Sequence, residues 1–170
     1  MALKSNIVLI GMPGAGKSTL GVVLAKILAY DFLDCDLLIQ NREGMTLQKL
    51  IDARGAEGFI ELENEALLTI RNTGTIIATG GSAVYSEEAM EYLSTIGNVV
   101  YLKVSLEELQ GRLGGLHERG VVMRGDCKSL ADLYAERQPL YEKYAEITID
   151  IDGLSVRNAA RELVDQLSMM

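Results

Sequence analysis

A glycine-rich segment near the start of the chain constrains its fold more than any other feature. The segment IVLIGMPGAGKST contains the pattern GxxxxGK[ST], formed by Gly11, Gly16, Lys17 and Ser18, between an apolar run and a helical one. In such a loop, backbone N–H groups converge on phosphate oxygens, and the following helix attracts them through its N-terminal dipole. The alternative is an ordinary glycine turn between a strand and a helix. Such a turn does not need the lysine and the serine that complete the pattern here. The chain is therefore predicted to bind a nucleoside triphosphate.

The residues of this loop have distinct expected tasks. Lys17 is expected to reach the β and γ phosphates, and the Ser18 hydroxyl is placed to bind Mg²⁺. ATP and Mg²⁺ are therefore the expected cofactors. The predicted nucleotide contacts are Gly14, Ala15, Gly16, Lys17, Ser18 and Thr19.

Short apolar runs alternate with helical stretches along the rest of the chain. Buried strands are expected at residues 7–10, 32–33, 75–78, 98–104 and 147–151. Helices are expected at residues 20–28, 58–71, 129–144 and 156–167, with a kink or break at Pro139. This alternation predicts one α/β domain over residues 1–170, built on a parallel sheet with helices on both faces.

Two further motifs follow predicted strands. After the second strand, in FLDCD, alternation would put Asp34 and Asp36 on the same side, at the edge that adjoins the phosphate loop. One carboxylate can hold Mg²⁺ through water, and the other can accept a proton from an attacking hydroxyl; capping of the next helix is the alternative. After the third strand, Gly80 and Gly81 allow backbone to approach a ligand, although a plain turn explains them equally well.

Composition excludes several other classes of protein. A formal net charge of −8 argues against binding to duplex nucleic acid. Cys35 and Cys127 are far apart and only His117 is available beside them, so neither a disulfide scaffold nor a structural zinc site is expected. No apolar run approaches the roughly 20 residues of a membrane span or resembles a signal segment. A cytoplasmic location, without a membrane or nucleic-acid partner, is the expectation.

Taken together, these motifs resemble the shikimate kinase family. GMPGAGKST, DCD and GG occur in the family's order, followed by a glycine-rich segment containing Arg119 and by ERQPLY around Arg137. The resemblance covers essentially the whole chain. It implies a nucleoside-monophosphate-kinase-like fold with sheet order 2-3-1-4-5, a substrate-binding insertion at about 37–63 and a lid at about 111–128. It also implies an enzyme of aromatic amino-acid biosynthesis that transfers the γ-phosphoryl group of ATP to the 3-hydroxyl of shikimate. A monomer is the separate expectation.

The resemblance also implies roles for individual residues. The catalytic residues would be Lys17, Asp36 and Arg119, with Arg119 contacting the phosphates from the lid. Ser18 and Asp34 would hold the metal, Asp34 through water. Acceptor contacts would come from the carboxylate of Asp36, the backbone of Gly80 and Gly81, and Arg137, which would bind the acceptor's carboxylate.

The chain also departs from the family pattern. Where the family has an arginine that shares the substrate carboxylate, Ile60 follows Phe59, although Glu63 keeps its expected place and gains a supporting role. Arg54, about one and a half helical turns before Ile60, is a candidate replacement for the missing arginine. The family's third glycine is Ser82 here, and its proline after the lid arginine is Gly120.

Ile60 leaves the identity of the acceptor open, and it is included among the predicted acceptor-site residues. A related kinase acting on a different polyol or hydroxy acid is one alternative. A nucleotide-binding regulatory protein without acceptor activity is another, against which Asp36 and Arg137 argue, because a switch needs neither a base nor a carboxylate clamp.

Overall fold

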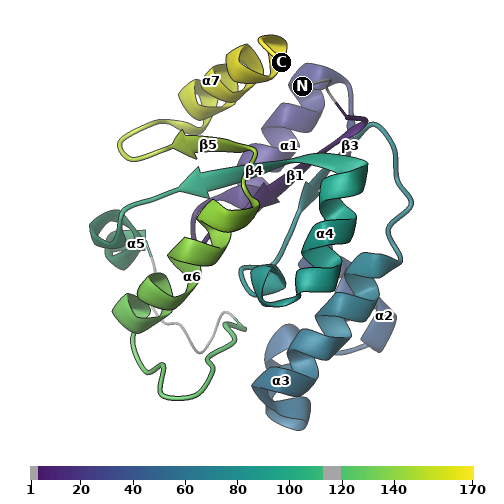
Figure 1. The fold of residues 1–170 in the computed structure, drawn as a ribbon, viewed down its shortest axis with the longest axis vertical. Helices are drawn as coiled ribbons and strands as arrows, with labels where there is room; N and C mark the ends of the chain where they lie inside the picture. Colours follow the sequence, from purple (N-terminus) through teal and green to yellow (C-terminus); the bar gives the residue numbers. More distant parts are fainter. Residues whose placement is uncertain (1–3, 113–119) are drawn as a thin grey trace.

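A five-stranded parallel sheet forms the centre of the protein (Figure 1). The computed structural model describes residues 4–112 and 120–170. The strands are β1 (Asn6–Ile10), β2 (Asp31–Asp34), β3 (Thr75–Ala78), β4 (Gly97–Lys103) and β5 (Ile147–Asp150). Their order is β2-β3-β1-β4-β5, and each neighbouring pair is parallel. The predicted fold class and strand order are confirmed.

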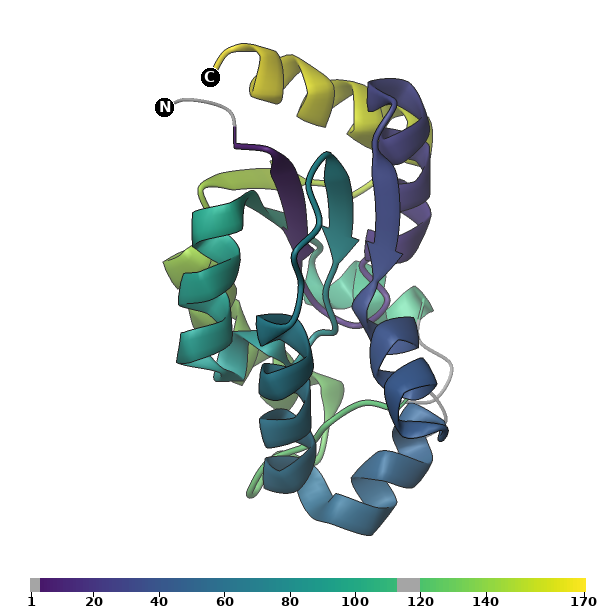
Figure 2. The same cartoon turned by 90° about the vertical axis from the view of Figure 1, so that its right-hand side faces the viewer.

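Helices cover both faces of this sheet (Figure 2). One face carries α1 (Lys17–Leu28) and α7 (Val156–Ser168), which pack on each other, and the other face carries α4 (Glu87–Ile96) and α6 (Leu130–Tyr144). Because both faces are covered, strands such as β1 are buried along their whole length and carry near-continuous apolar runs. The remaining helical segments are α2 (Cys35–Glu43), α3 (Leu47–Leu68), the 3₁₀ turn η1 (Ala83–Tyr85) and α5 (Leu106–Arg112).

The α2–α3 pair lies past the carboxyl ends of the strands, at the end of the molecule opposite α7 (Figures 1 and 2). In the sequence it separates β2 from β3, which includes the predicted substrate-binding insertion at about 37–63. Within the part of the chain that the structure describes, no helix is both long enough and apolar enough to cross a membrane.

The expected alternation of Asp34 and Asp36 along one strand was wrong. β2 ends at Asp34, whose Oδ1 accepts hydrogen bonds from the backbone N–H groups of Asp36 (2.9 Å) and Leu37 (3.2 Å). These bonds satisfy two of the unpaired N–H groups at the start of a helix. Asp36 therefore lies in the first turn of α2, and the helix cap takes the place of strand pairing.

Two helix predictions also need correction. The helix expected at residues 58–71 is the second part of α3, which begins at Leu47 and is interrupted at Gly55, where φ is 72° and ψ is 176°. Of the kink or break expected at Pro139, the break does not occur, since α6 runs from Leu130 to Tyr144. Pro139 and Ala135, whose carbonyl loses its helical partner to the proline ring, are both exposed, so water can satisfy that carbonyl.

Asn6, at the start of β1, connects three segments at the amino ends of the strands. Its Nδ2 group donates to the carbonyl oxygens of Asn72 (2.7 Å) and Ile96 (3.0 Å), and its Oδ1 accepts from the N–H of Thr75 (3.0 Å). The side chain is fully buried. It therefore holds the beginnings of β3 and β4 against β1.

We predict that Asn6→Ala destabilises the fold, because it leaves the buried N–H of Thr75 without its partner and removes the hydrogen bonds to the part-buried carbonyls of Asn72 and Ile96. The unsatisfied N–H costs about 1–3 kcal/mol and each lost bond about 0.5–1.5 kcal/mol, so the free energy of unfolding should fall by at least about 2 kcal/mol. Chemical denaturation measures this quantity. Ser5→Ala is the matched control, since Ser5 is exposed and makes only a 3.4 Å bond to Ile96, and it should change stability by less than about 0.5 kcal/mol. Equal effects of the two substitutions would contradict the assignment.

Candidate active site

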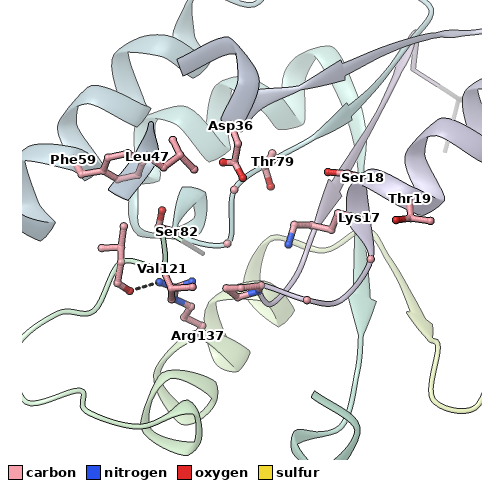
Figure 3. Close-up of a pocket in the computed structure, with 17 residues that line it drawn as sticks. Lys17, Ser18, Thr19, Asp36, Leu47, Phe59, Thr79, Ser82, Val121 and Arg137 are labelled. Atoms are coloured by element: carbon pink, nitrogen blue, oxygen red, sulfur yellow. Dashed lines mark hydrogen bonds between the residues drawn. The ribbon is translucent and has the colours of Figure 1, made fainter. Parts of the chain in front are cut away.

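A cleft of about 400 Å³ opens at the carboxyl edge of the sheet (Figure 3). It brings together the phosphate loop, the start of α2, the segment after β3, the backbone beyond residue 119 and one side chain of α6. Its lining consists of Pro13, Gly14, Gly16, Lys17, Ser18, Thr19, Asp36, Leu47, Phe59, Thr79, Gly80, Gly81, Ser82, Gly120, Val121, Val122 and Arg137. Most of the predicted site residues therefore meet in one place.

The phosphate loop leads directly into α1. Gly16 is the N-cap residue of α1 and has a φ of 92°, a conformation that favours glycine. Because glycine has no side chain to cap the helix, the first N–H groups of α1 remain available to an anion. Ala15 is buried, and its N–H donates to the carbonyl of Met12 at 3.1 Å. The loop is thus shaped to bind an anion mainly through residues 16–19.

Lys17 lies folded against its own loop. Its Nζ donates to the carbonyl oxygens of Gly11 (2.7 Å) and Met12 (2.9 Å). Burial lowers the pKa of Lys17 to about 8, an effect that the carboxylate of Asp36 opposes and the guanidinium of Arg137 reinforces. Because this ammonium group is poorly solvated, it would bind strongly to a phosphate group that takes the place of the carbonyl oxygens of Gly11 and Met12.

Ser18 and Asp34 lie side by side beneath the loop. The Ser18 hydroxyl donates to Asp34 Oδ2 at 2.8 Å, while the other carboxylate oxygen caps α2. Asp34 can therefore cap α2 with one carboxylate oxygen and contribute to a metal site with the other. Mg²⁺ prefers oxygen ligands and retains several waters beside one or two protein groups, so this hydroxyl–carboxylate pair fits it.

Asp36 presents its carboxyl group to the cleft from the first turn of α2 (Figure 3). Burial raises the pKa of this carboxyl group; Asp34 adds to the rise and Lys17 opposes it. A Cβ atom built on Gly80 would lie 2.9 Å from Asp36 Oδ1, so this carboxyl group faces the segment after β3. A carboxylate in this position can orient and deprotonate a hydroxyl that enters the cleft.

Arg137 is 1% exposed and held on two sides. Its Nε donates to the Tyr85 hydroxyl at 3.1 Å, and its Nη2 donates to the Val122 carbonyl at 2.6 Å. The remaining nitrogen, Nη1, faces Gly81, where a Cβ atom would approach to 2.7 Å. Gly81 thus permits the close approach of a guanidinium that can bind a carboxylate in the cleft.

Two residues considered for the acceptor site do not line the cleft. Ile60 is not part of the described cleft lining; it belongs to an apolar cluster with Phe59 and Val122, through which it can shape the wall. Arg54 is half-exposed and pairs with Glu43 at 3.6 Å, so it does not supply a guanidinium to the cleft. Arg119 lies outside the described residues.

Several cleft residues were missed by sequence reasoning. Thr79 immediately precedes the glycine pair at the end of β3, and this position was a usable signal. Leu47, Val121 and Val122 carry no local pattern, because they reach the cleft only through tertiary packing. Tyr85, which contacts Arg137 from η1, was missed for the same reason.

The sheet order and the phosphate loop, with a carboxyl group and a guanidinium in the same cleft, define a P-loop kinase fold. The family model for shikimate kinase matches residues 13–168. Shikimate kinases of Shewanella amazonensis and Vibrio vulnificus are 36% and 38% identical to the chain; the alignments cover 98% of this chain, and 99% and 98% of those proteins. The chain belongs to the shikimate kinase family.

A solved structure supports the same assignment. Shikimate kinase from Acinetobacter baumannii in complex with shikimate superimposes with a TM-score of 0.89 at 31% sequence identity. The match covers 99% of this chain and 94% of that one. The likeness therefore extends over both the sheet and the α2–α3 segment.

We predict that Lys17→Ala lowers ATP turnover by at least about 10²-fold, because the buried cation acts on the charge of the transferring group. Coupled measurement of ADP release tests this, with circular dichroism to show that the fold is retained. Lys26→Ala on the same helix is the matched control, since Lys26 is exposed, and it should leave turnover unchanged. Near-normal turnover of Lys17→Ala would remove the phosphate-loop mechanism.

Proposed function

We propose that this enzyme transfers the γ-phosphoryl group of ATP to the 3-hydroxyl of shikimate, a reaction of aromatic amino-acid biosynthesis. The observation that carries the proposal is the meeting of the phosphate loop, Asp36 and Arg137 in one cleft of a shikimate kinase family member. These groups match the charges of the two substrates: cations face phosphates and a carboxylate, and a carboxyl group faces the reacting hydroxyl.

The nucleotide side of the cleft binds and neutralises phosphates. Backbone N–H groups at the start of α1 hold the phosphate oxygens, and Lys17 Nζ exchanges the carbonyls of Gly11 and Met12 for the β and γ phosphates. Mg²⁺, held by Ser18 and through water by Asp34, would supply further charge neutralisation between these phosphates. The loop thereby positions the γ-phosphorus at the entrance to the acceptor side.

The acceptor side orients the nucleophile. Arg137 Nη1 binds the carboxylate of shikimate beside Gly81, and Asp36 accepts the proton of the 3-hydroxyl. The hydroxyl oxygen then forms a bond to the γ-phosphorus, while the bond from that phosphorus to the bridging oxygen breaks and ADP departs. Catalysis rests on positioning and charge stabilisation rather than on a covalent intermediate.

The segment at about 111–128 is proposed to act as a lid. Its described part includes Gly120, Val121 and Val122, which line the cleft. Arg119, just before them in the sequence, is proposed to contact the phosphates. Closure would exclude the water that otherwise competes with the acceptor for the phosphoryl group. The cytoplasmic location and the monomeric state stay predictions.

A different hydroxylated acceptor is the second candidate. Arg137 is the one guanidinium among the described cleft residues, and much of the acceptor wall is apolar, formed by Leu47, Phe59, Val121 and Val122. Such a wall also suits a polyol or hydroxy acid with a larger apolar face.

A panel of acceptors distinguishes these functions. Shikimate should stimulate ADP release and give a product that ³¹P and ¹H NMR identify as the 3-phosphate, whereas neutral polyols and other hydroxy acids should react slowly. Turnover of a neutral polyol without turnover of shikimate would establish the second candidate. Tight ATP binding with no acceptor-dependent turnover would instead indicate a regulatory nucleotide-binding protein.

We predict that Asp36→Asn lowers kcat by roughly 10²- to 10⁴-fold, because the amide keeps the shape of the side chain but cannot take the proton. ATP affinity should survive. Asp31→Asn, at the exposed start of β2, is the matched control and should leave kcat unchanged. Loss of ATP affinity with an unchanged KM for shikimate would show that Asp34 and Asp36 have exchanged roles.

A further inference from the structure

A tyrosine behind the cleft holds the guanidinium that faces the acceptor. Tyr85 lies in η1, is half-buried, and its hydroxyl accepts a hydrogen bond from Arg137 Nε at 3.1 Å. The carbonyl of Val122 accepts from Arg137 Nη2 at 2.6 Å, and Nη1 faces Gly81. Binding of a carboxylate by Nη1 therefore depends on how Tyr85 and Val122 orient this guanidinium.

Tyr85 decides which edge of the guanidinium a carboxylate can use. A guanidinium carries five N–H groups in a planar fork, so a carboxylate can bind either to the edge formed by Nε and Nη2 or to the edge formed by Nη1 and Nη2. Because the Tyr85 hydroxyl takes the Nε–H of Arg137, the first edge is not free. The edge that contains Nη1 remains, and it lies toward Gly81, which lines the cleft (Figure 3).

A second guanidinium contacts the same tyrosine. The Cζ atom of Arg124 lies 4.6 Å from the centre of the Tyr85 ring, and the Cζ atom of Arg137 lies 5.1 Å from it. Distances of this size allow cation–π attraction, and the planar group of arginine also stacks on aromatic rings. Tyr85 packs in addition against the apolar cluster that contains Phe59 and Ile60. Its ring is thus held by contacts from several elements.

Glu57 of α3 pairs with this second guanidinium. Arg124 Nε donates to Glu57 Oε1 at 2.9 Å, but the two side chains are 38% and 71% exposed. An ion pair this exposed is weak, because water screens it. The charge of Glu57 partly offsets the repulsion between the two guanidinium groups near one ring, and the contact of Arg124 with the ring is expected to do more to hold Tyr85.

We propose that Tyr85 is a positioning residue for the acceptor: it holds Arg137 so that the edge containing Nη1 meets the acceptor's carboxylate, and Arg124 holds Tyr85 in turn. Arg124 and Val122 belong to one segment, which therefore orients Arg137 both through a carbonyl and through the Tyr85 ring. Acceptors with a carboxylate gain from this arrangement, and uncharged polyols do not. This inference rests on the proposed function and names the residues that orient its carboxylate contact.

The first test measures shikimate binding by titration calorimetry with the complete chain. Tyr85→Phe keeps the ring and removes the hydroxyl, so it should weaken shikimate binding roughly three- to tenfold, raise KM for shikimate more than it lowers kcat, and leave ATP affinity unchanged. Unchanged or tighter binding would overturn the inference, since the Nε–H of Arg137 would then be dispensable or better used by the acceptor.

Tyr92→Phe is the matched control for this substitution. The Tyr92 hydroxyl accepts from Arg71 Nη1 at 2.6 Å, and Arg71 Cζ lies 5.3 Å from the centre of the Tyr92 ring, but neither residue lines the described cleft. Tyr92→Phe therefore removes the same kind of contact elsewhere in the protein. It should leave shikimate binding unchanged even if it lowers the thermal unfolding midpoint.

Substitutions around Arg124 separate the contact with the ring from the ion pair. Arg124→Lys keeps the charge and loses the planar group, so it should weaken shikimate binding about two- to fivefold. Glu57→Gln should change binding by less than about twofold. Arg71→Lys is the matched control and should bind shikimate as the wild type does. Wild-type affinity in Arg124→Lys would overturn the role of Arg124.

An uncharged acceptor analogue tests the carboxylate directly. Shikimate with its carboxylate replaced by a hydroxymethyl group should bind the wild type more weakly than shikimate does, and Tyr85→Phe should bind this analogue as well as the wild type does. Equal losses for shikimate and the analogue in Tyr85→Phe would show that Tyr85 supports the shape of the cleft and not the carboxylate contact. That outcome would overturn the inference.

The orientation of Arg137 can also be measured without an acceptor. In ¹⁵N-labelled protein, the Nε–H signal that is lost in Arg137→Lys should exchange with water at least about tenfold faster in Tyr85→Phe than in the wild type, because a buried hydrogen bond protects it. If it does, but the wild type neither binds nor phosphorylates shikimate, the proposed function fails and the orientation of Arg137 by Tyr85 is upheld. If the wild type phosphorylates shikimate but exchange and affinity are unchanged in Tyr85→Phe, only this inference fails.

Discussion

The carboxylate of Asp34 joins the two halves of the cleft. One oxygen accepts the N–H groups that begin α2, and the other accepts the Ser18 hydroxyl at the start of α1. The cap sets where α2 starts and so directs Asp36 into the cleft, while the Ser18 contact aligns the phosphate loop with that helix. The phosphate loop and the start of α2 are thus held relative to each other by a single side chain at the end of β2.

Sequence patterns of a few neighbouring residues predicted the elements whose conformation and burial depend mainly on those residues. The loop from Gly11 to Ser18 and the buried runs of β1 and β3 were identified because glycine conformation and full burial leave clear marks in a sequence. α2 was missed, since only Cys35 and Ile39 of its residues are buried and no apolar period exists. α4 was missed despite a usable signal, a Ser86 start followed by acidic residues and then by an apolar face.

The acceptor side could not be predicted to the same depth. Arg137, Tyr85 and Val122 are far apart in the sequence, and their hydrogen bonds exist only because η1, α6 and the segment beyond residue 119 pack together. The same holds for Ser82 and Glu63, whose contact links the end of β3 to α3. The sequence predicted that Asp36 belongs to the site, but it placed this residue in a strand and not in a helix. The site prediction held because either backbone conformation puts the carboxylate of Asp36 at the same edge of the sheet.

The electrostatics of the cleft explain how a chain of net charge −8 can bind two anionic substrates. Lys17 and Arg137 are buried, so their charges are poorly screened and act strongly within the cleft, while Asp36 and Glu63 balance them at short range. Lys17 therefore helps to keep the carboxyl group of Asp36 ionised, against the burial that raises its pKa. A carboxylate that is ionised and poorly solvated is the form that can take a proton from a hydroxyl in the cleft.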